Sequence, residues 1–299
     1  MKILSFGSMN IDNTYSVDEF VQPGETMTAK NLSKFCGGKG LNQSIALASA
    51  GADVAHFGCV GEDGDILLDM LKSRGVNTDS VIKIDNITSG HAIIQVDSHG
   101  QNSILLYPGA NRRMTPELID RELEKYSCGD WLLIQNETNC LEYIMRAANK
   151  KGMKIAFNPS PMDGTVSTLP LELVDLFLVN EIEGAAVTGK KNTEEITAEF
   201  EKLFPNAAVI LTLGKKGSVF KSEKDMLFQP SYCGTVKDTT GAGDTYTGFF
   251  IANYIKGVSP QECMRIAAMA STLQISRDGA AIAIPTKQEV LNALKNYCR

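Results

Sequence analysis

The chain is poor in the residues and patterns that mark metal-binding and disulfide-rich proteins. Its three histidines show no ligand spacing, and its seven cysteines are odd in number, scattered and never arranged as C-x-x-C. A zinc site or a disulfide framework is therefore not expected, and the thiols are predicted to be reduced, as in a cytosolic protein. The cysteines are Cys36, Cys59, Cys128, Cys140, Cys233, Cys263 and Cys298.

Long basic runs and long apolar runs are also missing. No Lys/Arg cluster exceeds a pair and the formal net charge is −6, which argues against a nucleic-acid partner, because such binding needs a basic surface. No stretch is apolar enough to span a membrane, and Asp12 interrupts the first residues before a signal-peptide core could form. We therefore expect a cytoplasmic protein without a membrane partner. A small phosphorylated ligand is compatible with this charge, since phosphates are often held locally by backbone N–H groups and one or two cations.

Apolar, β-rich runs alternate with helical patterns along most of the chain. This alternation predicts a mainly parallel central sheet with helices on both faces, formed as one α/β domain over residues 1–299. The expected strands are 2–7, 54–60, 131–135, 154–158, 176–180 and 209–213, and the expected helices include 41–50, 66–75 and 141–151.

Two stretches, residues 13–33 and 89–107, break this rhythm. Neither has a long helical period, and within the second stretch residues 92–96 and 103–107 alternate like two strands joined by a turn. We interpret both stretches as strands of a small lid that leaves one side of the main sheet. The alternative is that they are ordinary edge strands of that sheet.

The strongest local signal is the segment 238–245, Asp-Thr-Thr-Gly-Ala-Gly-Asp-Thr, which precedes an apolar helical pattern. Small residues at 241–243 let the backbone approach a ligand closely, and the unpaired N–H groups of a helix beginning near Ala242 would form an anion hole for a transferred phosphoryl group. Asp244 would then lie in the first turn, within reach of a substrate hydroxyl. A lone Asp at such a position more often caps its helix. The adjacent glycines and the other motifs favour the catalytic interpretation here.

Two further segments carry features of a small-ligand site. Residues 37–43, Gly-Gly-Lys-Gly-Leu-Asn-Gln, place Gly38 and Asn42 four apart at a helix start, so both can address one ligand. A helix-packing glycine pair is the alternative. Asn10 and Asp12 follow the first strand and point the same way in an extended chain, which suits the capture of sugar hydroxyls. Turn chemistry is the simpler interpretation of that pair taken alone.

Polar residues and glycines also follow several other predicted strands. Ligands of open α/β sheets collect where the parallel strands end, so these residues are candidates for one shared site, although each could be simple loop polarity. They are Glu137, Asn180, Glu183, Thr212, Gly214 and Gly217.

Together these segments resemble the ribokinase family (the PfkB-type carbohydrate kinases), and the resemblance extends over essentially the whole chain. Residues 238–245 resemble the C-terminal signature of the family, and residues 37–43 resemble its N-terminal signature. The resemblance implies a ribokinase-like fold and an ATP-dependent kinase that phosphorylates the primary hydroxyl of a pentose, with D-ribose as first choice. A relative acting on deoxyribose, a nucleoside or a keto-sugar acid is one alternative. A catalytically silent sugar-binding sensor is another.

The resemblance also implies roles for individual residues. Asp244 would be the catalytic base, and Gly241, Ala242 and Gly243 would supply the anion hole. The sugar would be bound by Asn10, Asp12, Gly38, Lys39, Asn42, Glu137 and Asp244, and the nucleotide by Asn180, Glu183, Thr212, Gly214, Gly217 and Gly243. Asn180 and Glu183 would also organise Mg²⁺. Activating K⁺ would be held by Asp238, Thr240, Gln274, Arg277 and Gly279.

The chain departs from the family pattern near the expected cation. Ala283 lies where the family usually has a serine, so one cation ligand is missing there, and no polar residue suited to adenine is evident around residues 267–270. A homodimer formed through the lid is also expected. The lid strands carry apolar side chains such as Ile93 and Leu105, and isolated small sheets are too small to bury such faces by themselves.

Overall fold

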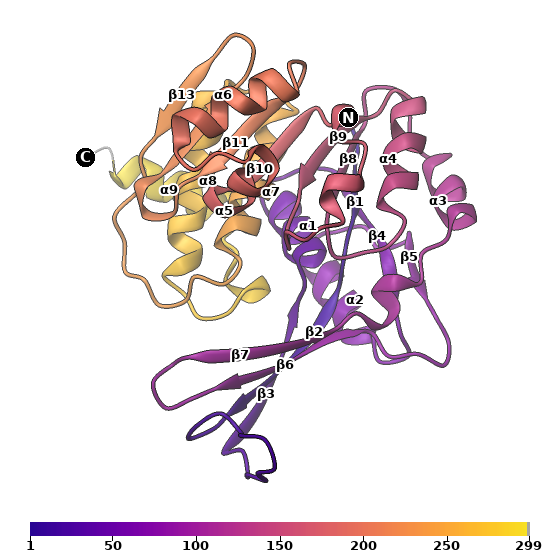
Figure 1. Ribbon diagram of the computed structural model, residues 1–299, viewed down its shortest axis with the longest axis vertical. Helices are drawn as coiled ribbons and strands as arrows, with labels where there is room; N and C mark the ends of the chain where they lie inside the picture. Colours follow the sequence, from indigo (N-terminus) through magenta and orange to yellow (C-terminus); the bar gives the residue numbers. More distant parts are fainter. Residues whose placement is uncertain (298–299) are drawn as a thin grey trace.

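The computed structural model describes residues 1–297, which form a large layered α/β body with a small sheet projecting from it (Figure 1). Cys298, one of the predicted reduced thiols, lies outside the described residues. The other six cysteines are unpaired. Within residues 1–297 no helix is both long and apolar enough to cross a membrane.

The main sheet has nine strands in the described part of the chain, in the order β13-β12-β11-β10-β9-β8-β1-β4-β5. Neighbours from β11 to β5 pair in parallel, whereas β12 and β13 are antiparallel at one edge. Parallel neighbours need long crossovers, which the intervening helices supply. The strands are β1 (Ile3–Phe6), β4 (Val54–Val60), β5 (Val81–Lys83), β8 (Trp131–Gln135), β9 (Lys154–Asn158), β10 (Leu176–Asn180), β11 (Ala208–Thr212), β12 (Ser218–Lys221) and β13 (Met226–Gln229).

Helices cover both faces of this sheet, and each face has its own apolar core. Successive side chains of a strand point to opposite faces, so Ile3 of β1 packs into one core and Leu4 into the other. The first core includes side chains of α1, α2, α7, α8 and α9, and the second includes those of α3, α4, α5 and α6. The predicted sheet with two helical layers is thereby confirmed. The helices are α1 (Lys39–Ser49), α2 (Asp65–Ser73), α3 (Pro116–Leu123), α4 (Leu141–Lys150), α5 (Glu181–Thr188), α6 (Thr193–Leu203), α7 (Ala242–Tyr254), α8 (Pro260–Ile275) and α9 (Lys287–Tyr297).

The small sheet, called the lid below, has the strand order β3-β2-β6-β7. It is separate from the main sheet and extends away from it (Figure 1), so the alternative of edge strands in the main sheet is wrong. Its strands are β2 (Asn10–Ser16), β3 (Asn31–Gly37), β6 (Gly90–Val96) and β7 (Asn102–Tyr107).

The lid strands begin closer to the main sheet than the sequence predicts. β2 starts at Asn10 and pairs with β3 on one side and β6 on the other, and β3 continues to Gly37. Asn10 and Asp12 therefore belong to the lid, and the prediction that they lie at the end of β1 is wrong. The chain changes sheet in the short segment after Phe6, and this places the two side chains beside the start of α1.

Candidate active site

Four neighbouring parallel strands end in polar side chains at the same edge of the main sheet. Gln135 at the end of β8 is in register with Asn158 at the end of β9. Asn180 at the end of β10 is likewise in register with Thr212 at the end of β11. Because parallel strands run in one direction, their last residues gather at one edge, which is where ligands of such sheets bind.

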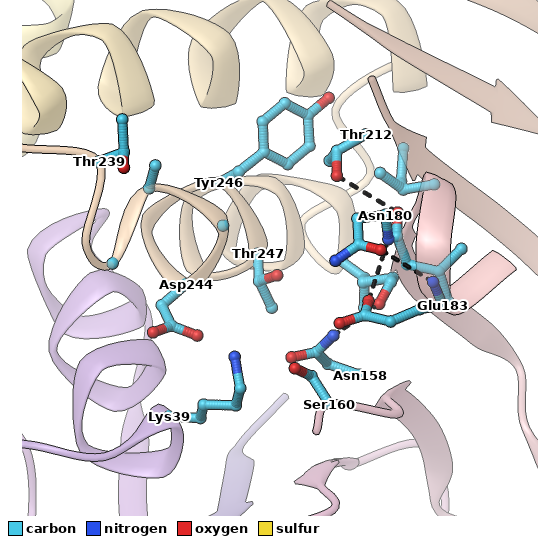
Figure 2. A pocket seen from close by; sticks show the side chains of 16 residues that line it. Lys39, Asn158, Ser160, Asn180, Glu183, Thr212, Thr239, Asp244, Tyr246 and Thr247 are labelled. Carbon is cyan, nitrogen blue, oxygen red and sulfur yellow. Dashed lines mark hydrogen bonds between the residues drawn. The ribbon is translucent and has the colours of Figure 1, made fainter. Parts of the chain in front are cut away.

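A cavity of about 280 Å³ lies between these strand ends and the start of α7 (Figure 2). In this view Lys39 from α1 and Asp244 from α7 lie on one side of the cavity, and Asn180 and Glu183 lie on the other. Of the residues predicted from the sequence, the cavity wall contains Lys39, Asn180, Glu183, Thr212, Gly241, Ala242, Gly243 and Asp244.

The start of α7 leaves backbone N–H groups free to meet a ligand. Gly241 is the N-cap in a left-handed conformation with φ of 77°, and the N–H of Ala242 donates to the carbonyl of Thr239 at 3.3 Å. The N–H groups of Gly243 and Asp244 have no partner within the helix, as at any helix start. The space beside Gly243 is open, with nothing within 4 Å of the position that a Cβ would take. An anion can therefore approach this turn closely.

Asp244 is 7% exposed as a residue, and its carboxylate is held by two side-chain amides of α1. Nδ2 of Asn42 donates to Oδ2 at 3.0 Å, and Nε2 of Gln43 donates to Oδ1 at 2.9 Å. Both oxygens thus bond to α1 and not to the backbone of α7, so helix capping does not explain this residue. Asn42 also keeps its own Oδ1 buried without a partner.

Gln43 links Asp244 to the strand ends through a chain of buried amides. Its Nε2 also donates to Oδ1 of Asn158 at 3.0 Å, and its Oε1 accepts from Nε2 of Gln135 at 2.8 Å. Nδ2 of Asn158 in turn donates to the carbonyl of Leu178 at 2.9 Å. Gln43 and Gln135 are fully buried. The chain fixes the position of Asp244 relative to the main sheet.

Lys39 supplies a positive charge to the cavity. Burial by itself lowers the pKa of this side chain, but the carboxylates of Asp244, Glu137 and Glu183 outweigh that effect, and the pKa is raised above its usual value. The ammonium group is therefore charged at neutral pH and points into the cavity (Figure 2).

The lid presents Asn10 in a fixed orientation at the edge of the site. Nδ2 of Asn111 donates to Oδ1 of Asn10 at 2.8 Å. The same Nδ2 donates to the carbonyl of Met9 at 3.2 Å, and Oδ1 of Asn111 accepts from the N–H of Met9 at 3.0 Å. A side chain at Gly90 would collide with this pair, since a Cβ would lie 2.1 Å from Asn111 and 2.3 Å from Asn10. Gly38, with φ of 93°, lies against the same segment at a longer distance, since a Cβ there would be 3.1 Å from the backbone N of Asn10.

Asp12 and Glu137 form a carboxylate pair between the lid and the main sheet. Burial and the charge of Glu137 raise the pKa of Asp12 to about 6. Oε2 of Glu137 accepts from the backbone N–H of Lys39 at 3.0 Å and from Oγ of Ser8. Glu137 thereby connects the loop after β8 to the start of α1, which carries Asn42 and Lys39.

Asn180 and Glu183 form a capping box at the start of α5. The N–H of Glu183 donates to Oδ1 of Asn180 at 2.8 Å, and the N–H of Asn180 donates to Oε2 of Glu183 at 3.0 Å. Both residues therefore stabilise the helix start. They also line the cavity, so the capping bonds leave both side chains at the wall of the space that a ligand would enter.

Gly214 and Gly217 lie outside the cavity wall, in the turn that follows Thr212. This turn is a short 3-10 helix, η4 (Gly214–Lys216), and both glycines have positive φ, 54° and 120°. A Cβ at Gly217 would lie 2.1 Å from the carbonyl oxygen of Gln229, so only glycine fits there. Thr212 itself donates from Oγ1 to the carbonyl of Val179 at 3.3 Å.

Of the residues predicted to hold K⁺, Asp238 and Thr240 lie in the loop before α7, Gln274 lies near the end of α8, and Arg277 and Gly279 lie in the loop after it. Oδ1 of Asp238 accepts from the N–H of Thr240 at 2.8 Å, and Oδ2 accepts from the N–H of Gly279 at 3.0 Å. Burial acts to raise the pKa of Asp238, but these hydrogen bonds outweigh it and lower the pKa. The carboxylate thus fastens one loop to the other. Among residues 1–297 no group of three or more His, Cys, Asp or Glu side chains is placed to hold a metal ion.

Several site residues were not predicted from the sequence. Asn158 ends β9 just before Pro159, so the strand-end argument that selected Asn180 would have found it. Gln43 lies inside the 37–43 motif but received no role, because its partners Asp244 and Gln135 are distant in sequence. Thr239 also lines the cavity and lies inside the 238–245 motif but received no role, whereas no pattern in the sequence distinguishes Ser160, Tyr246 and Thr247, which line it too.

A helix start open to anions, a buried carboxylate beside it and a charged lysine define a site for transferring an anionic group to a hydroxyl. On this α/β fold the class of protein is a phosphotransferase. The model of the pfkB family carbohydrate kinases matches residues 1–287, and the chain belongs to this family.

Relatives of known structure and sequence agree with that assignment. A ribokinase of Haemophilus influenzae is 33% identical over 298 residues, which cover 97% of each chain. The structure of a ribokinase from Thermotoga maritima is similar with a TM-score of 0.88 at 32% identity, covering 98% of this chain and 99% of that one. A ribokinase of Arabidopsis thaliana, solved with ribose and ATP, has a TM-score of 0.85 at 29% identity and 98% coverage of both chains.

Proposed function

We propose that this carbohydrate kinase transfers the γ-phosphoryl group of ATP to the primary hydroxyl of D-ribose, giving D-ribose 5-phosphate and ADP. The observation that carries the proposal is the buried carboxylate of Asp244, which lies in the first turn of α7 beside open N–H groups and a charged lysine. The ribokinase relatives support ribose as the substrate.

In the proposed reaction Asp244 accepts the proton of the primary hydroxyl as that oxygen attacks the γ-phosphorus. The bond from the γ-phosphorus to the β–γ bridging oxygen breaks, and ADP leaves. Negative charge on the transferred group is met by the N–H groups of Gly243 and Asp244 and by the ammonium of Lys39. Asn42 and Gln43 hold the carboxylate in place for this step.

Sugar hydroxyls would be bound between the lid and the start of α1. The candidate groups are Asn10, Asp12, Gly38, Lys39, Asn42 and Glu137. Oδ1 of Asn42 is buried and unpartnered, and a hydroxyl of the sugar can donate to it. Deoxyribose, nucleosides and keto-sugar acids would leave part of this polar set unpaired, and unpaired buried groups reject a substrate strongly.

The nucleotide would occupy the cavity at the ends of β9, β10 and β11, with Asn180, Glu183 and Thr212 along its phosphates and the turn at Gly214 and Gly217 beside its base. Mg²⁺ prefers carboxylate and phosphate oxygens and keeps several waters, so Glu183 with Asn180 suits an ion bound together with ATP. That ion would neutralise charge on the phosphates. The lack of a side-chain oxygen at Ala283 and the two backbone N–H bonds already accepted by Asp238 do not suit the K⁺ expected from the sequence.

Three further expectations belong to this proposal. The protein acts as one domain in the cytoplasm, and it forms a homodimer through the lid. β7 supports the dimer because its apolar side chains Ile104, Leu105 and Leu106 are 58%, 67% and 47% exposed. A catalytically silent sensor is disfavoured, because such a protein would have no need of the ordered carboxylate at Asp244.

The test is a coupled ATP-consumption assay with ribose, deoxyribose, fructose, adenosine and pseudouridine at equal concentration. We expect ribose to have the highest kcat/KM and the product to carry phosphate on its primary hydroxyl. Turnover of deoxyribose or a nucleoside at least as fast as ribose would overturn the substrate assignment. No turnover of any sugar would overturn the catalytic proposal.

A further inference from the structure

The side-chain amide of Gln274 fills a cage of backbone carbonyls next to the start of α7. Gln274 is fully buried on α8. Its Nε2 donates to the carbonyl oxygens of Thr240 at 3.1 Å, Gly279 at 3.0 Å and Ala280 at 3.0 Å. The three carbonyls come from two loops, one before α7 and one after α8.

The chemistry of the cage fixes which end of the amide points into it. Carbonyl oxygens only accept hydrogen bonds, so the terminal atom among three of them must be the NH₂ group. The other end, Oε1, is buried and has no hydrogen-bond donor near it. Rotating the amide would place an oxygen against three oxygens and is therefore excluded.

The same cage is where the sequence placed a monovalent cation. A hard cation would take the carbonyl oxygens of Thr240 and Gly279, and it would then coincide with Nε2 of Gln274. Both carboxylate oxygens of Asp238 already accept backbone N–H groups. The residues present therefore do not fit a bound K⁺.

The neighbouring residues argue in the same direction. Ala283 is buried and offers no side-chain oxygen. Its carbonyl lies 3.4 Å from Nη1 of Arg277, whose other terminal nitrogen bonds to Glu289 at 2.6 Å. The guanidinium thus brings a positive charge to this loop, where it would repel a second cation.

We propose that the amide of Gln274 replaces the monovalent cation and makes the enzyme independent of K⁺. The inference rests on the proposed kinase function, and it revises the K⁺ activation expected from the sequence. Thr240 directly precedes Gly241, the N-cap of α7, so the bond to its carbonyl holds the turn that leads into the anion hole. Gln274 is thus a positioning residue that ties this turn to the loop after α8.

The first experiment compares the wild-type chain in KCl, NaCl and choline chloride at constant ionic strength. Initial rates and the melting temperature are measured in each salt. We expect equal rates and equal melting temperatures in all three. A rate several-fold higher in KCl, or a melting temperature raised by KCl alone, would overturn the proposal.

Two substitutions of Gln274 distinguish the effect of emptying the cage from the effect of losing the amide N–H groups. Gln274→Ala opens the cage, so we expect the rate in choline chloride to fall roughly tenfold to a hundredfold, as for a displaced catalytic group, and KCl to restore it and raise the melting temperature. Gln274→Met fills the space without N–H groups, so its rate should fall and KCl should not restore it. Gln288→Ala, on the exposed surface of α9, is the matched control and should resemble wild type.

The outcomes keep the two proposals apart. If Gln274→Ala shows neither a lower rate nor a KCl-dependent melting temperature, the positioning role is wrong. If Gln274→Ala does not fold, Gln274→Met and the wild-type salt series still decide. A wild-type protein that turns over no sugar contradicts the proposed function, whereas the melting temperatures in the three salts still test whether the cage takes K⁺.

Discussion

Gln43 donates from its side-chain amide to Oδ1 of Asp244 across 2.9 Å, although the two residues are 201 positions apart in the chain. The same amide group bonds to Asn158, and its oxygen bonds to Gln135. The candidate base is therefore oriented by a fully buried side chain that itself is anchored on two strands of the main sheet.

Gln43→Leu should weaken both folding and catalysis. The substitution leaves Asn158 and Gln135 buried without their partner, at a cost of about 1–3 kcal/mol in the free energy of unfolding. We expect kcat to fall roughly tenfold, because one of the two bonds that orient Asp244 is lost, while KM for ribose changes little. Urea unfolding and steady-state kinetics measure the two effects. An unchanged kcat in a destabilised variant would show that the amide chain serves folding alone.

The raised pKa of Asp12 predicts a pH dependence of sugar binding. Hydroxyls of the sugar donate to an ionised carboxylate, and burial with Glu137 nearby raises the pKa of Asp12 to about 6. Affinity for ribose should therefore rise with pH and level off above pH 6, and near pH 5 it should be about tenfold weaker than at neutral pH. Calorimetry without nucleotide measures this. Asp12→Asn should bind ribose more weakly, with an affinity that no longer changes in this range.

The same group affects stability in the opposite direction. The folded-state pKa of Asp12, about 6, lies above the ordinary pKa of an aspartate side chain, so the folded chain holds this proton more tightly than the unfolded chain. Its contribution to the free energy of unfolding is complete below the unfolded pKa and is lost as pH rises through the folded pKa. If Asp12→Asn lost as much free energy of unfolding as wild type over the same rise in pH, the carboxylate of Asp12 would not be the source of that loss.

The exposed strand β7 predicts how two subunits associate. Leu105, at the centre of β7, is 67% exposed. β7 is the last strand of the lid, so no strand in the described part of the chain pairs with its outer edge. We expect wild type to sediment as a dimer at micromolar concentration and Leu105→Asp to sediment as a monomer. Ile182→Asp, which removes another exposed side chain far from the lid strands in sequence, is the control and should remain dimeric. A fully active wild-type monomer would contradict the lid interface.

Strands with strong apolar runs were predictable from the sequence. The polar residues that follow several of them also indicated the sheet edge at which the candidate site lies. The strands 54–60, 131–135, 154–158 and 176–180 were predicted with the bounds they have, because each is buried on both faces and bounded by loops. The membership of Asn10 in the lid was not predicted, since local pattern does not show where a chain changes sheet.

Contacts between distant segments were the part that the sequence could not supply. The 37–43 motif indicated Asn42 as a sugar ligand, but its bond to Asp244 arises only when α1 packs beside α7. Gln274 is the clearest case. Its position in the predicted cation site was recognised, whereas the direction of its side chain, into the cage, depends on the loops that α7 and α8 bring together.

The most direct test of the account is the substitution Asp244→Asn. Removing a general base typically lowers the rate by roughly 10²–10⁴. The fold should tolerate the new amide at position 244, because Asn42 can rotate its own side-chain amide. Oδ1 of Asn42, which has no partner in the wild-type structure, would then accept from the new NH₂ group. Steady-state kinetics with ribose and ATP, calorimetric ribose binding and the melting temperature are measured on the same preparation. We predict that kcat falls by two orders of magnitude or more, while ribose still binds and the melting temperature changes little. A variant that keeps near-normal kcat would contradict the role of Asp244.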